Sequence, residues 1–279
     1  MIHSTPTGSR AEGRANPSMK TSPTPRPSAS VVVIRECAGA PEILLVRRRA
    51  GDAFGDSYAF PGGVVDHDEA NAHAFCVGRT TQETDAILGK VNSLDYYSAA
   101  IRELFEETGI LLARDAAGNW SQPDASTGAL RIEVDKGRLA WPVFLQQRQL
   151  CMAGDALHYF AYWETPLDRS KRWTTRFFIA QLPPGQHASH DGSEITDSRW
   201  LTAAGALRLA RNGQLPMPFP TSRILADLVP LDSTAAFIDW AAQQSERGIT
   251  KIRPIVVEQN GEPAILIPGD PGYPEADEQ

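Results

Sequence analysis

At 279 residues, of which 42% are hydrophobic, the chain is long enough for one large or two small domains with a sizeable core. Its formal net charge of −7 argues against broad binding to nucleic acid or to a membrane surface, because both need a basic footprint. The chain has no apolar run that would span a bilayer, no signal-peptide core and three widely spaced cysteines that suit a reducing compartment, so we expect a soluble cytoplasmic protein.

The two ends of the chain differ in composition from its middle. Residues 1–29 are rich in Ser, Thr, Pro, Gly and Arg and hold almost no bulky apolar side chain. Such a stretch cannot offset the entropy of ordering, so we expect a disordered tail. Residues 271–279 include the acidic run PEADEQ, which is expected to fray. Between them there is no internal repeat and no clean linker, so residues 30–270 are predicted to form one elaborated domain.

Two short runs of β-branched and aliphatic residues open this domain. Residues 30–34 (SVVVI) and 43–46 (ILLV) are predicted to be buried strands joined by a turn. Arg47, Arg48 and Arg49 follow the second run. Arginine suits bidentate contact with phosphate, so Arg47 and Arg49 are candidate substrate contacts. The alternative is a solvated strand end.

Three glutamates mark the stretch AAIRELFEETGI at residues 99–110. Glu103, Glu106 and Glu107 stand at i, i+3 and i+4, which places them on one face of a helix. Like charges at this spacing repel one another. The repulsion is understandable if a divalent cation lies among them, because hard oxygen ligands are what Mg²⁺ and Mn²⁺ take. The alternative is a solvated helix face on which Arg102 pairs with Glu106.

A glycine pair stands well before this helix, in the stretch AFPGGVVDHDE at residues 59–69. Gly62 and Gly63 allow a backbone to approach a ligand or a metal closely. Together the two stretches resemble the box of the Nudix hydrolase family: Gly, five residues, Glu, seven residues, then Arg-Glu-aliphatic-x-Glu-Glu-x-Gly-aliphatic. The positions that match are Gly63, Glu69, Arg102, Glu103, Leu104, Glu106, Glu107, Gly109 and Ile110.

The sequence departs from the family pattern in the middle of the box. Thirty-two residues, 70–101, stand where the family usually has seven. An interrupted box of this kind is similar to that of the coenzyme A diphosphatase-like branch of the family. Within the insertion, assigned to residues 70–96, residues 81–91 have a helical pattern. The insertion is either a lid over the substrate or plain packing against the domain.

Strand patterns return after the box. A proline-initiated helix is predicted at 142–149, and apolar runs at 158–164 and 176–182 are predicted strands. In the Nudix likeness the second of these strands crosses the substrate cleft. The resemblance therefore implies that Arg176 meets a phosphate, while the neighbouring Phe177 either stacks on a base or packs in the core.

A polar loop at 187–194 leads into a short strand that ends at Trp200. In the Nudix pattern a glutamate six residues before such a tryptophan completes the metal site, and Glu194 stands at that offset. The alternative is an ordinary loop carboxylate. The remainder, 216–270, is predicted to be a C-terminal extension of helices and a hairpin.

The resemblance implies an α/β fold: a Nudix-type α/β/α sandwich with a mixed β-sheet, an insertion inside the box and a C-terminal helical and hairpin extension. It implies an enzyme that hydrolyses a diphosphate bond in a nucleoside-diphosphate derivative, with Mg²⁺ or Mn²⁺ as cofactor. Coenzyme A or acyl-coenzyme A is one substrate class. ADP-ribose, NADH, dinucleoside polyphosphates and a non-catalytic nucleotide-binding module remain open, as does a homodimer.

The same resemblance assigns roles to individual residues. Arg102 orients the carboxylates through charged hydrogen bonds, and Glu103 or Glu194 acts as the base that takes a proton from water. The implied metal ligands are the Gly62 carbonyl and the carboxylates of Glu103, Glu106, Glu107 and Glu194.

Overall fold

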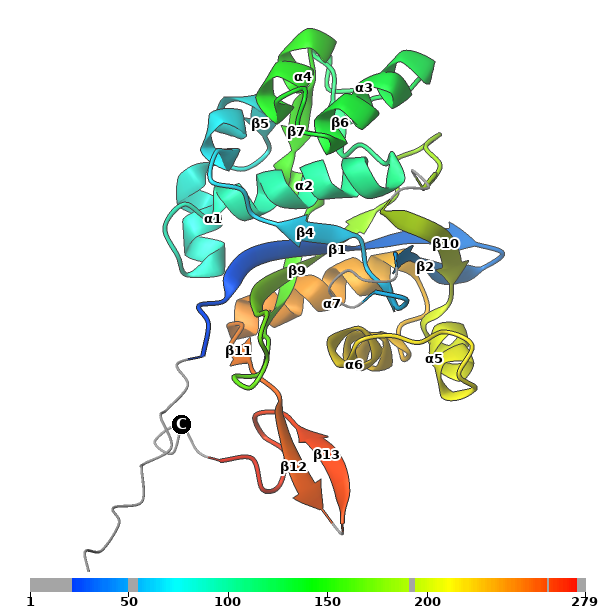
Figure 1. Cartoon of the computed structure of the whole chain (residues 1–279). Coiled ribbons are helices and arrows are strands. Elements are labelled where there is room, and N and C mark those ends of the chain that lie inside the picture. The colour runs from blue at the N-terminus through cyan, green and yellow to red at the C-terminus, as the bar shows by residue number, and fades with distance from the viewer. Residues whose placement is uncertain (1–21, 50–54, 191–193, 260, 275–279) are drawn as a thin grey trace, which may run out of the picture.

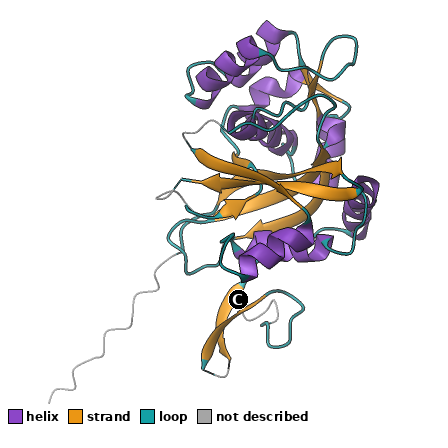
Figure 2. Cartoon of the chain, turned by 90° about the vertical axis from the view of Figure 1, so that its right-hand side faces the viewer, coloured by secondary structure: helices purple, strands orange, loops and turns teal. Residues whose placement is uncertain are grey.

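The structure, a computed structural model, describes residues 22–49, 55–190, 194–259 and 261–274. A mixed β-sheet lies between two layers of helices (Figures 1 and 2). β1 pairs with β9 in parallel, and β8 pairs with β11 in parallel, while the other pairs of this sheet are antiparallel. In order the strands are β10 (Ile195–Leu201), β2 (Ala40–Arg48), β1 (Arg26–Cys37), β9 (Trp173–Gln181), β8 (His158–Glu164) and β11 (Lys251–Ile252), with β3 (Tyr58–Ala59) beside β2 and β4 (Gly62–Val64) beside β1.

Both faces of the central strands are covered, which explains their continuous apolar runs. Because side chains alternate along a strand, Val31 and Val33 of β1 join the core on one side and Val32 and Ile34 join the core on the other. These four side chains are fully buried. The α/β/α arrangement predicted from the sequence is therefore what the chain adopts.

Helix α2 (Leu94–Thr108) covers one face of the sheet and carries the three glutamates. Its apolar side chains, among them Tyr97 and Leu104, are buried, and the Tyr97 ring lies 4.9 Å from the Phe178 ring between centroids. Gly109 ends the helix in the left-handed region at φ 72°. The other helices of this layer are α1 (Thr81–Leu88), α3 (Ala125–Asp135) and α4 (Trp141–Arg148).

The insertion inside the box is built into this layer. It forms a 3₁₀ helix, η1 (Glu69–Phe75), then β5 (Cys76–Val77) and α1. Strand β5 joins a small sheet with β7 (Cys151–Ala153) and β6 (Ala113–Arg114), and a second 3₁₀ helix, η2 (Gly154–Ala156), follows β7. Ala72 and Leu88 are buried in the core beside α2, together with Leu94, the first residue of that helix. Of the two interpretations of the insertion, the structure supports packing.

The opposite face of the sheet is covered by the C-terminal half of the chain. Here lie α5 (Ala203–Arg211), α6 (Phe219–Leu228) and α7 (Thr234–Arg247), and beyond them a hairpin of β12 (Ile255–Gln259) and β13 (Glu262–Leu266) extends away from the sheet (Figure 1). The described residues contain no helix that is both long enough and apolar enough to span a bilayer.

The predicted tail, 1–29, overlaps the first strand. β1 begins at Arg26 because its residues pair with β9, from Arg26 opposite Trp173 onward. Backbone pairing with a distant strand thus orders a segment whose own composition predicts disorder. Residues 1–21 lie outside the described part of the chain, as do 275–279 of the predicted frayed end.

Candidate active site

The glycine pair lies directly against helix α2, although 32 residues separate the two halves of the box. The Gly62 backbone N–H donates a hydrogen bond to Glu107 Oε2 at 2.9 Å. At Gly63 a Cβ atom would come within 2.4 Å of the Glu103 carboxylate. An alanine there would force the Glu103 carboxylate to shift, so glycine allows β4 to lie against the carboxylate in its present position.

The Arg102 guanidinium connects the two halves of the box. Its Nε and Nη2 donate to Glu69 Oε1 at 3.0 and 2.8 Å, and Nη2 also donates to the Val64 carbonyl at 3.0 Å. Its Nη1 donates to Glu103 Oε1 at 3.1 Å and to Glu106 Oε2 at 2.9 Å. The arginine predicted to orient the carboxylates therefore contacts two of them, together with the glutamate of the first half.

Burial makes these carboxylates costly to ionise. It raises the pKa of Glu106 and of Glu107 to about 8, in spite of the neighbouring arginines, which lower it. Burial also raises the pKa of Glu103. For Arg102 burial alone would lower the pKa, but the surrounding carboxylates raise it above its usual value. A further cation beside the glutamates would favour their charged forms.

A second arginine, Arg48 at the end of β2, lies on the other side of the glutamates. Its Nη1 donates to Glu194 Oε1 at 2.9 Å, and its Nη2 donates to Glu107 Oε1 at 2.6 Å and to the Gly62 carbonyl oxygen. Three of the five predicted metal ligands thus contact one guanidinium. The sequence allowed two interpretations of Glu194, a metal ligand or an ordinary loop carboxylate. The structure places it beside the box, in contact with Arg48.

Of the three consecutive arginines, Arg48 lies in the site, whereas the sequence pointed to Arg47 and Arg49. Arg48 is on the same side of β2 as Val46, which packs in the α2 core. The alternation of a strand places Arg47 on the other side, where it pairs with exposed Asp56 at 2.7 Å. Arg49 is exposed. Neither Arg47 nor Arg49 lines the cleft described below, so the geometry does not support their predicted role.

Arg176 is also placed away from the predicted phosphate contact. Its side chain is buried between two tyrosine rings, with its guanidinium carbon 4.4 Å from the Tyr96 centroid and 4.2 Å from the Tyr162 centroid. Its neighbours on β9, Thr175 and Phe177, line the cleft, and Arg176 points to the opposite face. Cation–π stacking explains its position.

A cleft of about 990 Å³ opens beside the carboxylates and extends along β8 and β9 to the C-terminal hairpin. Its inner end is lined by Arg48, Gly62, Glu103, Glu106 and Glu194.

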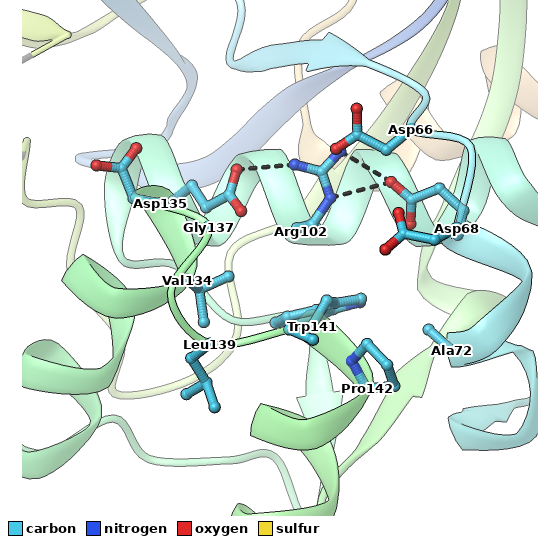
Figure 3. A pocket seen from close by; sticks show the side chains of 13 residues that line it. Asp66, Asp68, Ala72, Arg102, Val134, Asp135, Gly137, Leu139, Trp141 and Pro142 are labelled. Atoms are coloured by element: carbon cyan, nitrogen blue, oxygen red, sulfur yellow. Dashed lines mark hydrogen bonds and ion pairs between the residues drawn. The ribbon is translucent and has the colours of Figure 1, made fainter.

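A smaller pocket of about 240 Å³ lies on the other side of Arg102. Figure 3 shows the guanidinium between Asp66 and Asp135, with Trp141 lying across the pocket from it. Three residues line both cavities and so separate the smaller pocket from the cleft: Arg102, Glu106 and Asp135.

The chemistry of the donors fits a divalent metal. The side chains around the inner end are carboxylates, the Gly62 carbonyl adds a neutral oxygen, and Mg²⁺ and Mn²⁺ prefer such hard oxygen ligands. Within the described ranges no three Asp, Glu, His or Cys side chains form a ready-made coordination group. Arg48 and Arg102 hold the carboxylates instead, so the ligand roles remain predictions.

Comparison with known proteins gives consistent results. A family model described as the NUDT19 Nudix domain matches residues 74–225. The chain is 27% identical over 277 residues to acyl-coenzyme A diphosphatase NUDT19 of Xenopus laevis, covering 84% of this chain and 72% of that protein. It is 30% identical over 191 residues to the human protein of the same name, covering 62% and 49%. The solved structure of a Nudix hydrolase from Alicyclobacillus acidocaldarius is similar, with a TM-score of 0.66 and 26% identity over 77% of this chain and 96% of that one.

These similarities confirm the fold class and the resemblance drawn from the box. The matched region begins after Glu69, so it includes the glutamate helix but not the glycine pair. The contacts of Gly62 and Gly63 with α2 therefore add independent support for the first half of the box.

We predict that Gly63→Ala displaces the Glu103 carboxylate, because the added methyl group would overlap it. Hydrolytic activity should fall at least about tenfold, the order expected when a reacting group is misplaced by part of an ångström. Gly128→Ala is the matched control, since a Cβ there meets nothing within 4 Å. Equal activity of the two variants in a steady-state assay would contradict the account.

We also predict that Arg48→Met lowers the free energy of unfolding by about 2 kcal/mol when no divalent metal is added. Breaking a fully buried ion pair costs roughly 3–5 kcal/mol. The loss here is smaller because the Arg48 side chain is 17% exposed and Glu107, whose pKa is already raised, can take up a proton. Arg47→Met, which breaks an exposed pair, should change the value by less than about 0.5 kcal/mol. Urea denaturation of both variants measures the difference, and equal losses would show that Arg48 is not the counter-ion of the site.

Proposed function

Because the chain belongs to the Nudix hydrolase family, we propose that it hydrolyses the diphosphate bond of coenzyme A and of its acyl thioesters. The products are 3′,5′-ADP and phosphopantetheine, or the acylated form of the latter. The main support is the meeting of the glycine pair, Arg102 and the glutamates at the inner end of a large cleft. The coenzyme A specificity is drawn from relatives whose names state it, among them the Xenopus laevis and human proteins.

The resident cofactor of the proposal is Mg²⁺ or Mn²⁺. The Gly62 carbonyl oxygen would hold it together with four carboxylates, and when bound it neutralises charge on the phosphates and favours ionisation of a water molecule. Those carboxylates belong to Glu103, Glu106, Glu107 and Glu194.

The side chains of this protein supply positioning and proton transfer. Arg102 holds Glu103 and Glu106 by charge-assisted hydrogen bonds at 3.1 and 2.9 Å, which limits their rotation. A water oxygen attacks one phosphorus, its proton passes to a carboxylate, and the bond from that phosphorus to the bridging oxygen breaks. Glu103 and Glu194 both line the cleft and are the two candidates for this base. Burial raises the pKa of Glu103.

Glu106→Gln and Glu107→Gln should each lower kcat at least about a hundredfold, because each removes a charged oxygen from the proposed metal site. Glu133→Gln is the control, since Glu133 on α3 is an exposed partner of Arg138. The measurement is chromatographic release of 3′,5′-ADP from coenzyme A and from an acyl thioester in Mg²⁺ or Mn²⁺. Chelation with EDTA should abolish release, and the added metal should restore it.

Two results would overturn different parts of this proposal. Wild-type rates in both glutamine variants would exclude the metal site. Hydrolysis of ADP-ribose, NADH or a dinucleoside polyphosphate without hydrolysis of coenzyme A would leave the metal site standing and exclude the substrate.

A further inference from the structure

The cleft has an apolar arm that leads away from the carboxylates. Its aromatic side chains come from distant segments and adjoin one another: the ring centroids of Phe60 and Phe177 are 6.3 Å apart, and those of Trp163 and Phe219 are 6.1 Å apart. The outer end of the arm reaches the C-terminal hairpin. We define the apolar arm by its lining residues Phe60, Trp163, Phe177, Phe219, Val256 and Ile265.

The hairpin contributes a pair of uncovered aliphatic side chains to the apolar arm. Val256 of β12 lies directly opposite Ile265 of β13, so both side chains are on one face of the hairpin. They are 48% and 43% exposed, and both line the cleft. Single exposed aliphatic residues are common on proteins, but two neighbours that face a cleft already lined by aromatic rings form a continuous apolar surface.

The hairpin is tied to the sheet at its base. Strand β11, just before it, pairs in parallel with β8, placing Ile252 beside Trp163. Lys251 Nζ lies 2.5 Å from Glu164 Oε2, and Glu164 is buried. The wall formed by Val256 and Ile265 is therefore held next to the strand that supplies Trp163.

We propose that the apolar arm binds the acyl chain of an acyl-coenzyme A. The inference rests on the proposed function and extends it from the diphosphate to the acyl group. Pantetheine stands between the diphosphate and the acyl chain, so a substrate whose diphosphate lies at the carboxylates carries its apolar end away from them. The cleft runs without a break from Glu103 to Ile265, so one elongated substrate can span both ends.

The experiment compares free coenzyme A with decanoyl-coenzyme A as substrates of Val256→Asp and Ile265→Asp. A charge on the apolar wall should lower kcat/KM for the decanoyl thioester about tenfold, mainly through KM, because contacts of one or two methylene groups change discrimination by roughly that factor. For free coenzyme A the value should change less than about twofold. Val229→Asp is the control, because Val229 is similarly exposed, at 45%, but does not line the cleft.

A binding measurement separates failure of this inference from failure of the proposed function. S-decanoyl-pantetheine carries no diphosphate, so calorimetric titration of the wild-type chain with it does not depend on hydrolysis. Binding that weakens about tenfold in Val256→Asp supports the apolar arm whatever diphosphate the enzyme cleaves. Absence of binding to the wild-type chain, or equal binding by the wild type and Val256→Asp, would overturn the inference.

Discussion

The site depends on the buried contact between Glu69 and the guanidinium of Arg102. Glu69 is almost fully buried, and burial raises its pKa, so it is costly to keep as an unpaired charge. Two hydrogen bonds from Arg102 offset that cost and fix the first half of the box against helix α2. With Glu69 in place, the same guanidinium reaches Glu103 and Glu106. The Arg102 side chain thus joins the segment of the glycine pair to the carboxylates of α2.

This contact also explains how an interrupted box can keep its geometry. Lengthening the connection from seven to 32 residues adds only about 1.3 kcal/mol of closure entropy for a flexible loop. The inserted residues are ordered, and Ala72 and Leu88 bury their side chains in the core beside α2. Their packing offsets the entropy of ordering them, and the ends of the insertion stay together. The insertion is therefore a support for the site.

The sequence predicted the parts of the site that depend on local spacing, while contacts between distant segments were beyond it. The glutamates share a face because helical geometry dictates it, and a glycine at 63 suits the close approach that the structure shows. Phosphate chemistry alone does not distinguish Arg48 from its two arginine neighbours. Strand alternation does, and it also directs Arg176 away from the cleft. The early start of β1 and the apolar arm depend on pairings such as Arg26 with Trp173, which no local pattern contains.

The most direct test of the account is a double-mutant cycle between Glu69→Gln and Arg102→Ala, read from urea denaturation without added metal. Each single change should destabilise the fold, because Arg102→Ala leaves Glu69 a buried charge without its guanidinium partner, and Glu69→Gln removes one of the carboxylates that Arg102 holds. If the pair joins the two halves of the box, the two losses overlap, and the coupling energy should reach about 2–3 kcal/mol. Losses that add within about 0.5 kcal/mol would show that the two residues act independently, which would contradict the account.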